Sequence, residues 1–102
     1  MVEHVTFTSE ADEAVAAAYR WYEDREPGLG EDFLRRLEAC LLTIRRHPQL
    51  YPIAVDEFRC ALMRRFPYEV FYEISDGTLF VYAVFHCSQD PDKWRERLGY
   101  WS

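Results

Sequence analysis

The apolar residues of this chain change their spacing near its middle. Before residue 48 they recur every three or four positions, which is typical of helices, and after residue 56 they alternate, which is typical of strands. The second part also contains Asp76-Gly77 between two alternating runs, the strongest short signal for a two-residue β-hairpin. Helices that precede a hairpin-connected sheet place the chain in the α+β class.

The first part predicts one strand and a helical hairpin. Residues 2–8 are rich in β-branched side chains and predict a strand, and Ser9 offers an N-cap for a helix from about Ser9 to about Arg25. The run Pro27-Gly28-Leu29-Gly30 ends that helix. A second helix follows and stops at Pro48, so two helices with a short connection must pack as an antiparallel pair.

The second part predicts three antiparallel strands, Glu57 to Arg65, Tyr68 to Ile74 and Thr78 to Cys87. With Asp76-Gly77 as the turn, alternation pairs Ile74 with Leu79 and continues to Tyr68 opposite Phe85. That face is apolar, and we expect the helical hairpin to cover it. The opposite face, here called the mixed face, combines rings, carboxylates and a histidine: Glu69, Phe71, Glu73, Phe80, Tyr82, Val84 and His86.

Pro67 leaves two registers open for the strand from Glu57 to Arg65. We choose the register that puts Phe58, Cys60 and Leu62 in the core, since it sets Arg59 opposite Glu73 as a cross-strand ion pair. A short helix at 91–98 completes a single domain of residues 1–102, an antiparallel sheet with a helical hairpin on one face.

Charge and composition exclude several classes of protein. The chain has a formal net charge of −6, no apolar run of membrane-spanning length and no signal peptide, so we expect a cytoplasmic protein. Three cysteines without a CxxC spacing suggest neither a disulfide framework nor a metal site, and no cofactor is expected. Residues 34–68 nevertheless carry seven bases against three acids, which favours an anionic partner there.

No enzyme motif is present, but one group of side chains has the chemistry to cleave RNA: Arg59, Arg64, Arg65, Glu73, Tyr82, His86, Arg95 and Arg97. Guanidinium groups stabilise phosphorane charge, and a histidine can protonate a leaving oxygen. Structural roles explain the same residues equally well. Arg59 and Glu73 would hold two strands together, Arg64 and Arg65 would be solubilising charges, and His86 would be a hydrogen-bonded core residue.

A set of short elements spread from about Ala11 to Arg97 resembles the RelE/ParE family of type II toxins. The elements are Ala18-Tyr19-Arg20-Trp21-Tyr22-Glu23, Pro27-Gly28-Leu29-Gly30 with Phe33, Ile44 and His47-Pro48 with Tyr51-Pro52, Arg59, Arg65-Phe66-Pro67-Tyr68, Phe71-Tyr72, Ala83-Val84-Phe85-His86, Asp90-Pro91, and Trp94 with Arg97. The resemblance implies a β-α-α-β-β-β toxin of the plasmid-stabilisation type. It also implies a hetero-oligomer with an antitoxin encoded nearby, whose disordered tail wraps the toxin.

The resemblance leaves the target open between two branches. ParE-like members inhibit DNA gyrase, whereas RelE-like members cleave mRNA in the ribosome and often carry an arginine where this chain has Glu69. A carboxylate there would repel the scissile phosphate, and we therefore favour a non-enzymatic gyrase inhibitor that arrests growth. The alternatives are a ribosome-dependent endoribonuclease with Arg59, Arg65 and His86 as catalytic residues, and an inactive relative that only binds an antitoxin.

In either active branch we expect one surface to bind the target or the antitoxin. It comprises Arg59, Arg64, Arg65, Phe71, Phe80, Tyr82, His86, Arg95 and Arg97. The antitoxin should supply acidic side chains to these arginines and an amphipathic segment to the rings.

Overall fold

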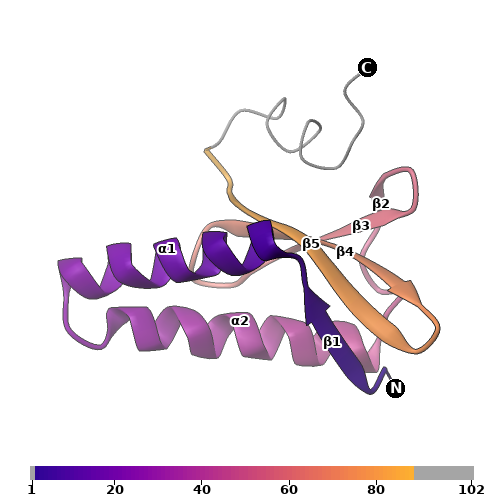
Figure 1. Ribbon diagram of the computed structural model, residues 1–102, viewed down its shortest axis with the longest axis horizontal. Coiled ribbons are helices and arrows are strands. Elements are labelled where there is room, and N and C mark those ends of the chain that lie inside the picture. Colours follow the sequence, from indigo (N-terminus) through magenta and orange to yellow (C-terminus); the bar gives the residue numbers. More distant parts are fainter. Residues whose placement is uncertain (1, 89–102) are drawn as a thin grey trace.

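The computed structural model describes residues 2–88 and has two helices packed on one face of a five-stranded sheet (Figure 1). In chain order the elements are β1 (His4–Phe7), α1 (Ser9–Arg25), α2 (Leu29–Arg46), β2 (Ile53–Val55), β3 (Phe58–Leu62), β4 (Tyr68–Ser75) and β5 (Thr78–His86). The α+β class and the helical hairpin are thereby confirmed. The expected helix at 91–98, with Arg95 and Arg97, lies outside the described residues.

Helix α1 begins one residue after its cap. Thr8, not Ser9, is the N-cap, and its hydroxyl oxygen accepts the backbone N–H of Ala11 at 3.1 Å. The predicted cap was wrong by one residue because both residue types favour that position. The helix ends where Pro27 and Gly28 follow, and Gly28 has a φ of 91°, a conformation that glycine adopts without strain.

The helical hairpin is closed by a carboxylate and a close backbone approach. Glu23 of α1 accepts the N–H groups of Gly28 and Gly30 at 2.9 to 3.1 Å, so it satisfies free donors at the start of α2. A Cβ atom on Gly30 would lie 2.8 Å from the carbonyl oxygen of Tyr19. The two helices therefore come together at a position where only glycine fits.

The sheet is mixed, with strand order β1-β5-β4-β3-β2 (Figure 1). The β3–β4 and β4–β5 pairs are antiparallel as predicted. Strand β2 pairs antiparallel with β3, and β1 lies parallel to β5 at the sheet edge. The segment predicted as a loop from Pro48 to Asp56 contains the short edge strand β2, which is an addition to the expected topology.

A bulge in β5 changes the register of the central hairpin. Ile74 pairs with Leu79 and Tyr72 with Val81, as predicted, but Tyr82 is an extra residue on β5. Beyond it Val70 pairs with Val84 and Tyr68 with His86. The predicted pairs of Val70 with Ala83 and Tyr68 with Phe85 were wrong, because one extra residue exchanges the two faces of the strand.

The bulge moves Val84 and His86 from the mixed face to the helical side of the sheet. Val84 is buried in the main core there, with Val70 and Tyr72 as neighbours. Ala83 and Phe85 take the opposite side and form a second small cluster with Phe71. An alternating sequence could not reveal this exchange, since both series are apolar.

The register chosen for β3 was also wrong. Arg59 pairs with Tyr72 and Ala61 with Val70, so Ala61 lies in the core under the helices. Phe58 and Cys60 point to the other side, and Leu62, the last residue of β3, is 59% exposed. In this register Ala61 is fully buried, and Arg59 reaches the carbonyl oxygen of Tyr51.

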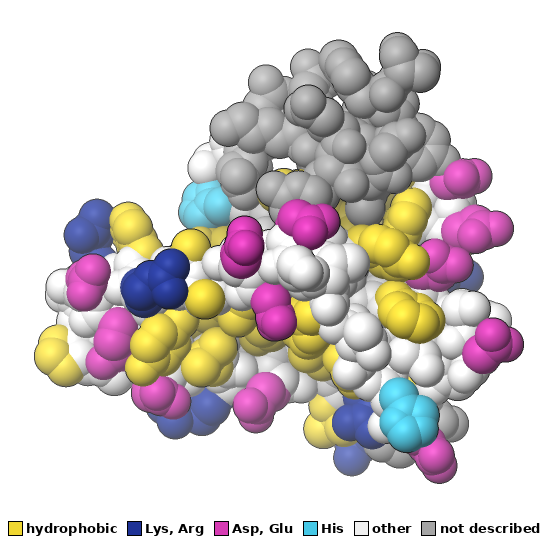
Figure 2. All heavy atoms as spheres, viewed as in Figure 1, with side chains coloured by type: hydrophobic (Ala, Val, Ile, Leu, Met, Phe, Trp, Pro, Cys, Tyr) yellow, Lys and Arg dark blue, Asp and Glu magenta, His cyan; other side chains and the backbone are white. Residues whose placement is uncertain are grey.

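The main core contains a cluster of four rings between the helices and the β3–β4 turn. Tyr22 and Phe33 stack with centroids 5.6 Å apart, and Phe66 and Tyr68 pack against both at 4.9 to 6.3 Å. On the surface, hydrophobic side chains follow the helical hairpin and carboxylates spread over the same view (Figure 2). Neither helix in residues 2–88 has the length and apolarity needed to cross a membrane.

Candidate functional site

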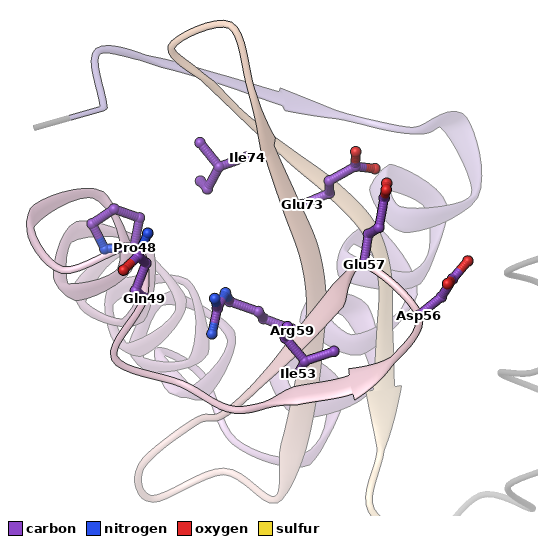
Figure 3. Close-up of a pocket in the computed structure, with 8 residues that line it drawn as sticks. All are labelled: Pro48, Gln49, Ile53, Asp56, Glu57, Arg59, Glu73 and Ile74. Carbon is purple, nitrogen blue, oxygen red and sulfur yellow. The ribbon is translucent and has the colours of Figure 1, made fainter.

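Arg59 lies in an open hollow between the loop after α2 and the β2–β3 hairpin. The hollow has a volume of about 550 Å³ (Figure 3). The guanidinium points toward the loop that holds Pro48 and Gln49, and its Nη1 donates to the carbonyl oxygen of Tyr51 at 2.6 Å. Arg59 is thus used to fix a loop, and the predicted position opposite Glu73 is not observed.

The charge around Arg59 is negative. Asp56, Glu57 and Glu73 line the same hollow, so carboxylates outnumber the one arginine there (Figure 3). Like charges within a few ångströms of each other repel by about 1 kcal/mol or more even in a watery environment. The hollow therefore does not favour a phosphate group.

Arg65 is tied to the start of α2. It lies in the β3–β4 turn with a φ of 73°, and its Nη1 is 3.2 Å from Oδ2 of Asp32. Asp32 also accepts a hydrogen bond from Arg35 at 2.9 Å. The hydrogen bond from Arg35, together with the charge of Arg65, lowers the pKa of Asp32.

His86 ends β5 beside α1, on the helical side of the sheet. Its Nδ1 accepts the backbone N–H of Ser88 at 3.0 Å, and its ring meets Tyr68 edge to face at 5.1 Å. It lines a hollow of about 380 Å³ together with Ala17, Ala18, Trp21, Tyr22, Tyr68 and Ser88. Burial raises the pKa of the Tyr68 hydroxyl to about 12, so this hydroxyl stays protonated.

The three candidate catalytic residues do not converge on one point. Arg59 and His86 pair with β4 residues that are four positions apart, on strands two spacings apart. Standard strand geometry separates them by ~13 Å along the sheet and ~10 Å across it. Arg65 contacts the ring of Phe66, and the rings of Tyr22 and Tyr68 lie between Phe66 and His86. No phosphate can contact all three groups in this conformation.

Glu69 lies among thiols rather than beside a guanidinium. Its Oε2 accepts a hydrogen bond from Sγ of Cys60 at 3.2 Å. Burial and this carboxylate raise the pKa of the Cys60 thiol, and burial and Glu69 likewise raise that of Cys87. Both thiols are therefore neutral near pH 7 and unsuited to nucleophilic chemistry.

The predicted aromatic residues of the mixed face divide into two groups. Tyr82 packs edge to face on Phe58 with centroids 4.8 Å apart, and Phe80 lies 6.4 Å from Tyr82, all partly exposed. Phe71 is buried against Phe85 at 6.0 Å. Of the predicted rings, Phe80 and Tyr82 are thus accessible, whereas Phe71 is a core residue.

Arg64 belongs to a separate hollow, here called the α2/β3 groove, with a volume of about 390 Å³. It is lined by Arg36, Ala39, Cys40 and Thr43 of α2, by Leu50 and Tyr51 of the following loop, and by Leu62 and Arg64. The sequence interpretation missed Arg36, Leu50 and Leu62 as surface residues. The signal for Leu62 was present in the β3 alternation, but the wrong register assigned it to the core.

A family model described as the ParE toxin of the type II toxin-antitoxin system, parDE, matches residues 5–91. The chain belongs to this ParE toxin family. No curated protein matches it significantly. The chain shares its fold with several solved structures, two of which follow.

One, described as the chromosomal ParDE toxin-antitoxin system from P. aeruginosa, aligns with a TM-score of 0.65 and 13% identity, covering 83% of this chain and 96% of that one. The other, the isolated E. coli RelE toxin, aligns with a TM-score of 0.60 and 16% identity, covering 93% of this chain and 97% of that one. The helical hairpin over a mixed sheet is therefore the fold of both toxins.

The described part of this ParE-family chain has an open groove in which exposed apolar side chains lie beside arginines. Among residues 2–88 there is no group of histidine, cysteine and carboxylate side chains that could hold a metal ion. Exposed apolar side chains beside arginines, as in the α2/β3 groove, are instead typical of surfaces that bind other proteins.

Proposed function

We propose that this ParE-family chain is a growth-inhibiting toxin that binds DNA gyrase, blocks replication and is neutralised by a cognate antitoxin in a cytoplasmic hetero-oligomer. One observation carries the choice of gyrase: Arg59, Arg65 and His86 are dispersed, and each is engaged with protein groups. Acid–base catalysis on a phosphodiester needs these groups within hydrogen-bond reach of one substrate. A toxin that acts by binding has no such requirement.

The electrostatics of the surface support the same choice. The net charge is −6, and carboxylates surround Arg59. RNA binding depends on Lys and Arg side chains that displace counterions from the phosphates, and around Arg59 the carboxylates outnumber the arginine. A protein target instead tolerates a surface that alternates acidic, basic and aromatic patches.

The direct test is a supercoiling assay with purified gyrase, relaxed plasmid and ATP. We expect the purified chain to inhibit supercoiling in proportion to its concentration, and we expect the protein encoded by the neighbouring open reading frame to restore it. Full gyrase activity at a large molar excess of the chain would contradict gyrase as the target.

The endoribonuclease alternative has one favourable feature, because His86 and Tyr68 place an imidazole and a hydroxyl-bearing ring in contact. Primer extension on mRNA translated with the purified chain distinguishes the two functions. We expect no new cuts. Cuts that are lost in His86→Ala would establish the ribonuclease, and an absence of both activities and of toxicity in a growth assay would indicate an inactive relative.

A further inference from the structure

We propose that Ser88 is a nucleophile activated by His86, and that this pair transfers acyl groups from small aryl esters to water. The reactivity lies outside the proposed function, because it depends neither on the target nor on an antitoxin. It is carried by one contact at the end of β5, where Oγ of Ser88 lies 2.7 Å from Nδ1 of His86. A hydroxyl within hydrogen-bond reach of an imidazole nitrogen is the arrangement that activates serine nucleophiles.

The backbone at the end of β5 sets the roles of the two groups. The N–H of Ser88 donates to Nδ1 of His86 at 3.0 Å, so in the neutral ring the lone pair is assigned to Nδ1 and the proton to the other nitrogen. The Ser88 hydroxyl must then donate to Nδ1 rather than accept from it. Its proton therefore points at the base before any substrate binds.

The strand and the turn after it hold this pair in place. His86 pairs with Tyr68 of β4, and the ring of Tyr68 meets the imidazole edge to face at 5.1 Å. The next residue, Cys87, donates its backbone N–H to the carbonyl oxygen of Pro67 at 2.8 Å. The base and the chain that leads to the nucleophile are thus fixed by contacts to β4 and the turn before it.

An apolar hollow beside the pair can hold a small acyl group. His86 and Ser88 both line the hollow of about 380 Å³ between α1 and β5, here called the α1/β5 hollow. Its other described lining residues are small or aromatic: Ala17, Ala18, Trp21, Tyr22 and Tyr68. Hollows of this size with an apolar lining and a few polar groups suit small organic molecules. The hollow therefore favours an ester with a short apolar acyl chain.

The hydroxyl of Ser88 is accessible, and the thiol next to it is not activated. Ser88 is exposed and His86 is partly exposed, so an ester can reach the pair from solvent. Burial and Glu69 raise the pKa of the Cys87 thiol, which keeps it protonated near pH 7. Acylation is therefore expected on Ser88 and not on Cys87.

Acyl transfer by this pair needs no reactant besides the ester and water. Nδ1 of His86 takes the hydroxyl proton while Oγ of Ser88 forms a bond to the carbonyl carbon of the ester. The bond from that carbon to the phenol oxygen breaks, and the phenolate leaves with the electron pair and takes the proton from the imidazolium. Water, deprotonated in the same way, then attacks the acyl-serine, and the serine oxygen leaves and regains its proton. Ester and water thus give a carboxylic acid and a phenol.

The test follows the release of 4-nitrophenolate from 4-nitrophenyl butyrate by the purified full chain. Ser88→Ala and His86→Gln should each lower the rate of acylation roughly 100-fold, the usual contribution of an assisted nucleophile. The matched controls are Ser75→Ala, an exposed serine at the end of β4, and His4→Gln, an exposed histidine of β1. Both controls should retain the wild-type rate.

Mass spectrometry of the acid-quenched protein locates the acyl group. We expect one butyryl group per chain, and fragmentation of the peptide that contains both residues should place it on Ser88. The Cys87→Ala variant should be labelled to the same extent. A label on Cys87 that this variant loses would assign the reactivity to the thiol and overturn the proposal.

A pair of helix variants tests the α1/β5 hollow without touching the reacting groups. Ala17→Trp fills the hollow from an exposed position of α1, whereas Ala16→Trp adds the same ring at an exposed position outside it. We expect about tenfold slower acylation for Ala17→Trp and less than about twofold for Ala16→Trp, with equal thermal unfolding temperatures. Equal rates in these two variants would remove the hollow as the acyl site.

The proposal fails if Ser88→Ala reacts as fast as Ser75→Ala, since the wild-type rate would then come from scattered surface groups. If Ser88→Ala or His86→Gln does not fold, the labelled residue and the two helix variants still decide. Gyrase inhibition by the wild-type chain is measured separately, so the loss of either activity leaves the other standing.

Discussion

Two regions of this molecule combine apolar side chains with arginines, but only in one of them are the apolar side chains packed and the arginine paired. At the first, the rings of Tyr22, Phe33 and their neighbours pack together, and Arg65 is neutralised by Asp32. In the α2/β3 groove, leucines remain exposed, and the ion pairs among residues 2–88 do not include the arginines of the groove. Where the chain supplies a partner, an arginine serves the fold, and in the groove the same two kinds of side chain stay exposed.

The largest expected difference between the two regions is in stability. Phe33→Ala removes a fully buried ring and should lower the free energy of unfolding by about 3 to 5 kcal/mol. Leu62→Ala in the groove should change it by less than ~0.5 kcal/mol, because Leu62 is already mostly exposed. Urea unfolding followed by fluorescence measures both, and a comparable loss for Leu62→Ala would mean that the groove is part of the core.

Substitutions that enlarge a side chain should also affect the packed helical hairpin more than the open groove. Gly30→Ala forces a Cβ to within 2.8 Å of the Tyr19 carbonyl oxygen and should cost about 1 to 3 kcal/mol through separation of the helices. Ala39→Leu adds a larger group to the open groove and should be nearly neutral. Chemical denaturation of both variants is the measurement, and a neutral Gly30→Ala would show that the helical hairpin is loosely packed.

The carboxylate that closes the helical hairpin should contribute a smaller amount. Glu23→Gln removes the charge that accepts the N–H groups of Gly28 and Gly30, and we expect a loss of about 1 kcal/mol. Asp24→Asn, at the exposed neighbouring position, is the control and should have little effect. Thermal unfolding of the two variants side by side would reject this role if their midpoints fall equally.

The smallest expected effect is on the titration of Asp32. Its pKa is lowered, so the ion pairs stabilise the fold above the ordinary carboxyl pKa of 3.8 and are lost as the pH falls through the lower native value. Arg35→Gln should raise the pKa of Asp32 more than Arg65→Gln, because the hydrogen bond from Arg35 is the larger cause. A carbon-detected NMR titration of the carboxyl group checks the order, and the reverse order would make Arg65 the main partner.

The helices and the central turn could be predicted from the sequence because local signals determine them. Ala11 and Ala18 lie seven positions apart on one face of α1, and both are buried. Pro27 and Gly28 end α1 where predicted. Asp76-Gly77 forms the turn, with both residues at positive φ. Each of these features depends on a few neighbouring residues.

The registers could not be predicted because apolar residues occupy both series of the alternation. Tyr82 carries no local mark of a bulge, since Ala83, Val84 and Phe85 are all plausible core residues. On β3 both Cys60 and Ala61 are plausible core residues, and Ala61 is the one that lies in the main core. These register errors also affected the candidate site. In the structure His86 lies on the side of α1 and Arg59 does not pair with Glu73. Leu62, which the predicted register assigned to the core, is exposed.

The pairing of β1 with β5 has a consequence for the order in which the chain is made. His4–Phe7, among the first residues to be synthesised, find their backbone partners only in Thr78 to Val81. The hydroxyl of Thr8 likewise donates a hydrogen bond to the carbonyl oxygen of Tyr82, 74 positions later in the chain. Contacts this distant in sequence form late, so the ribosome must have delivered the chain through Val81 before β1 and β5 can pair. Any effect that depends on the finished sheet is therefore delayed until β5 has been translated.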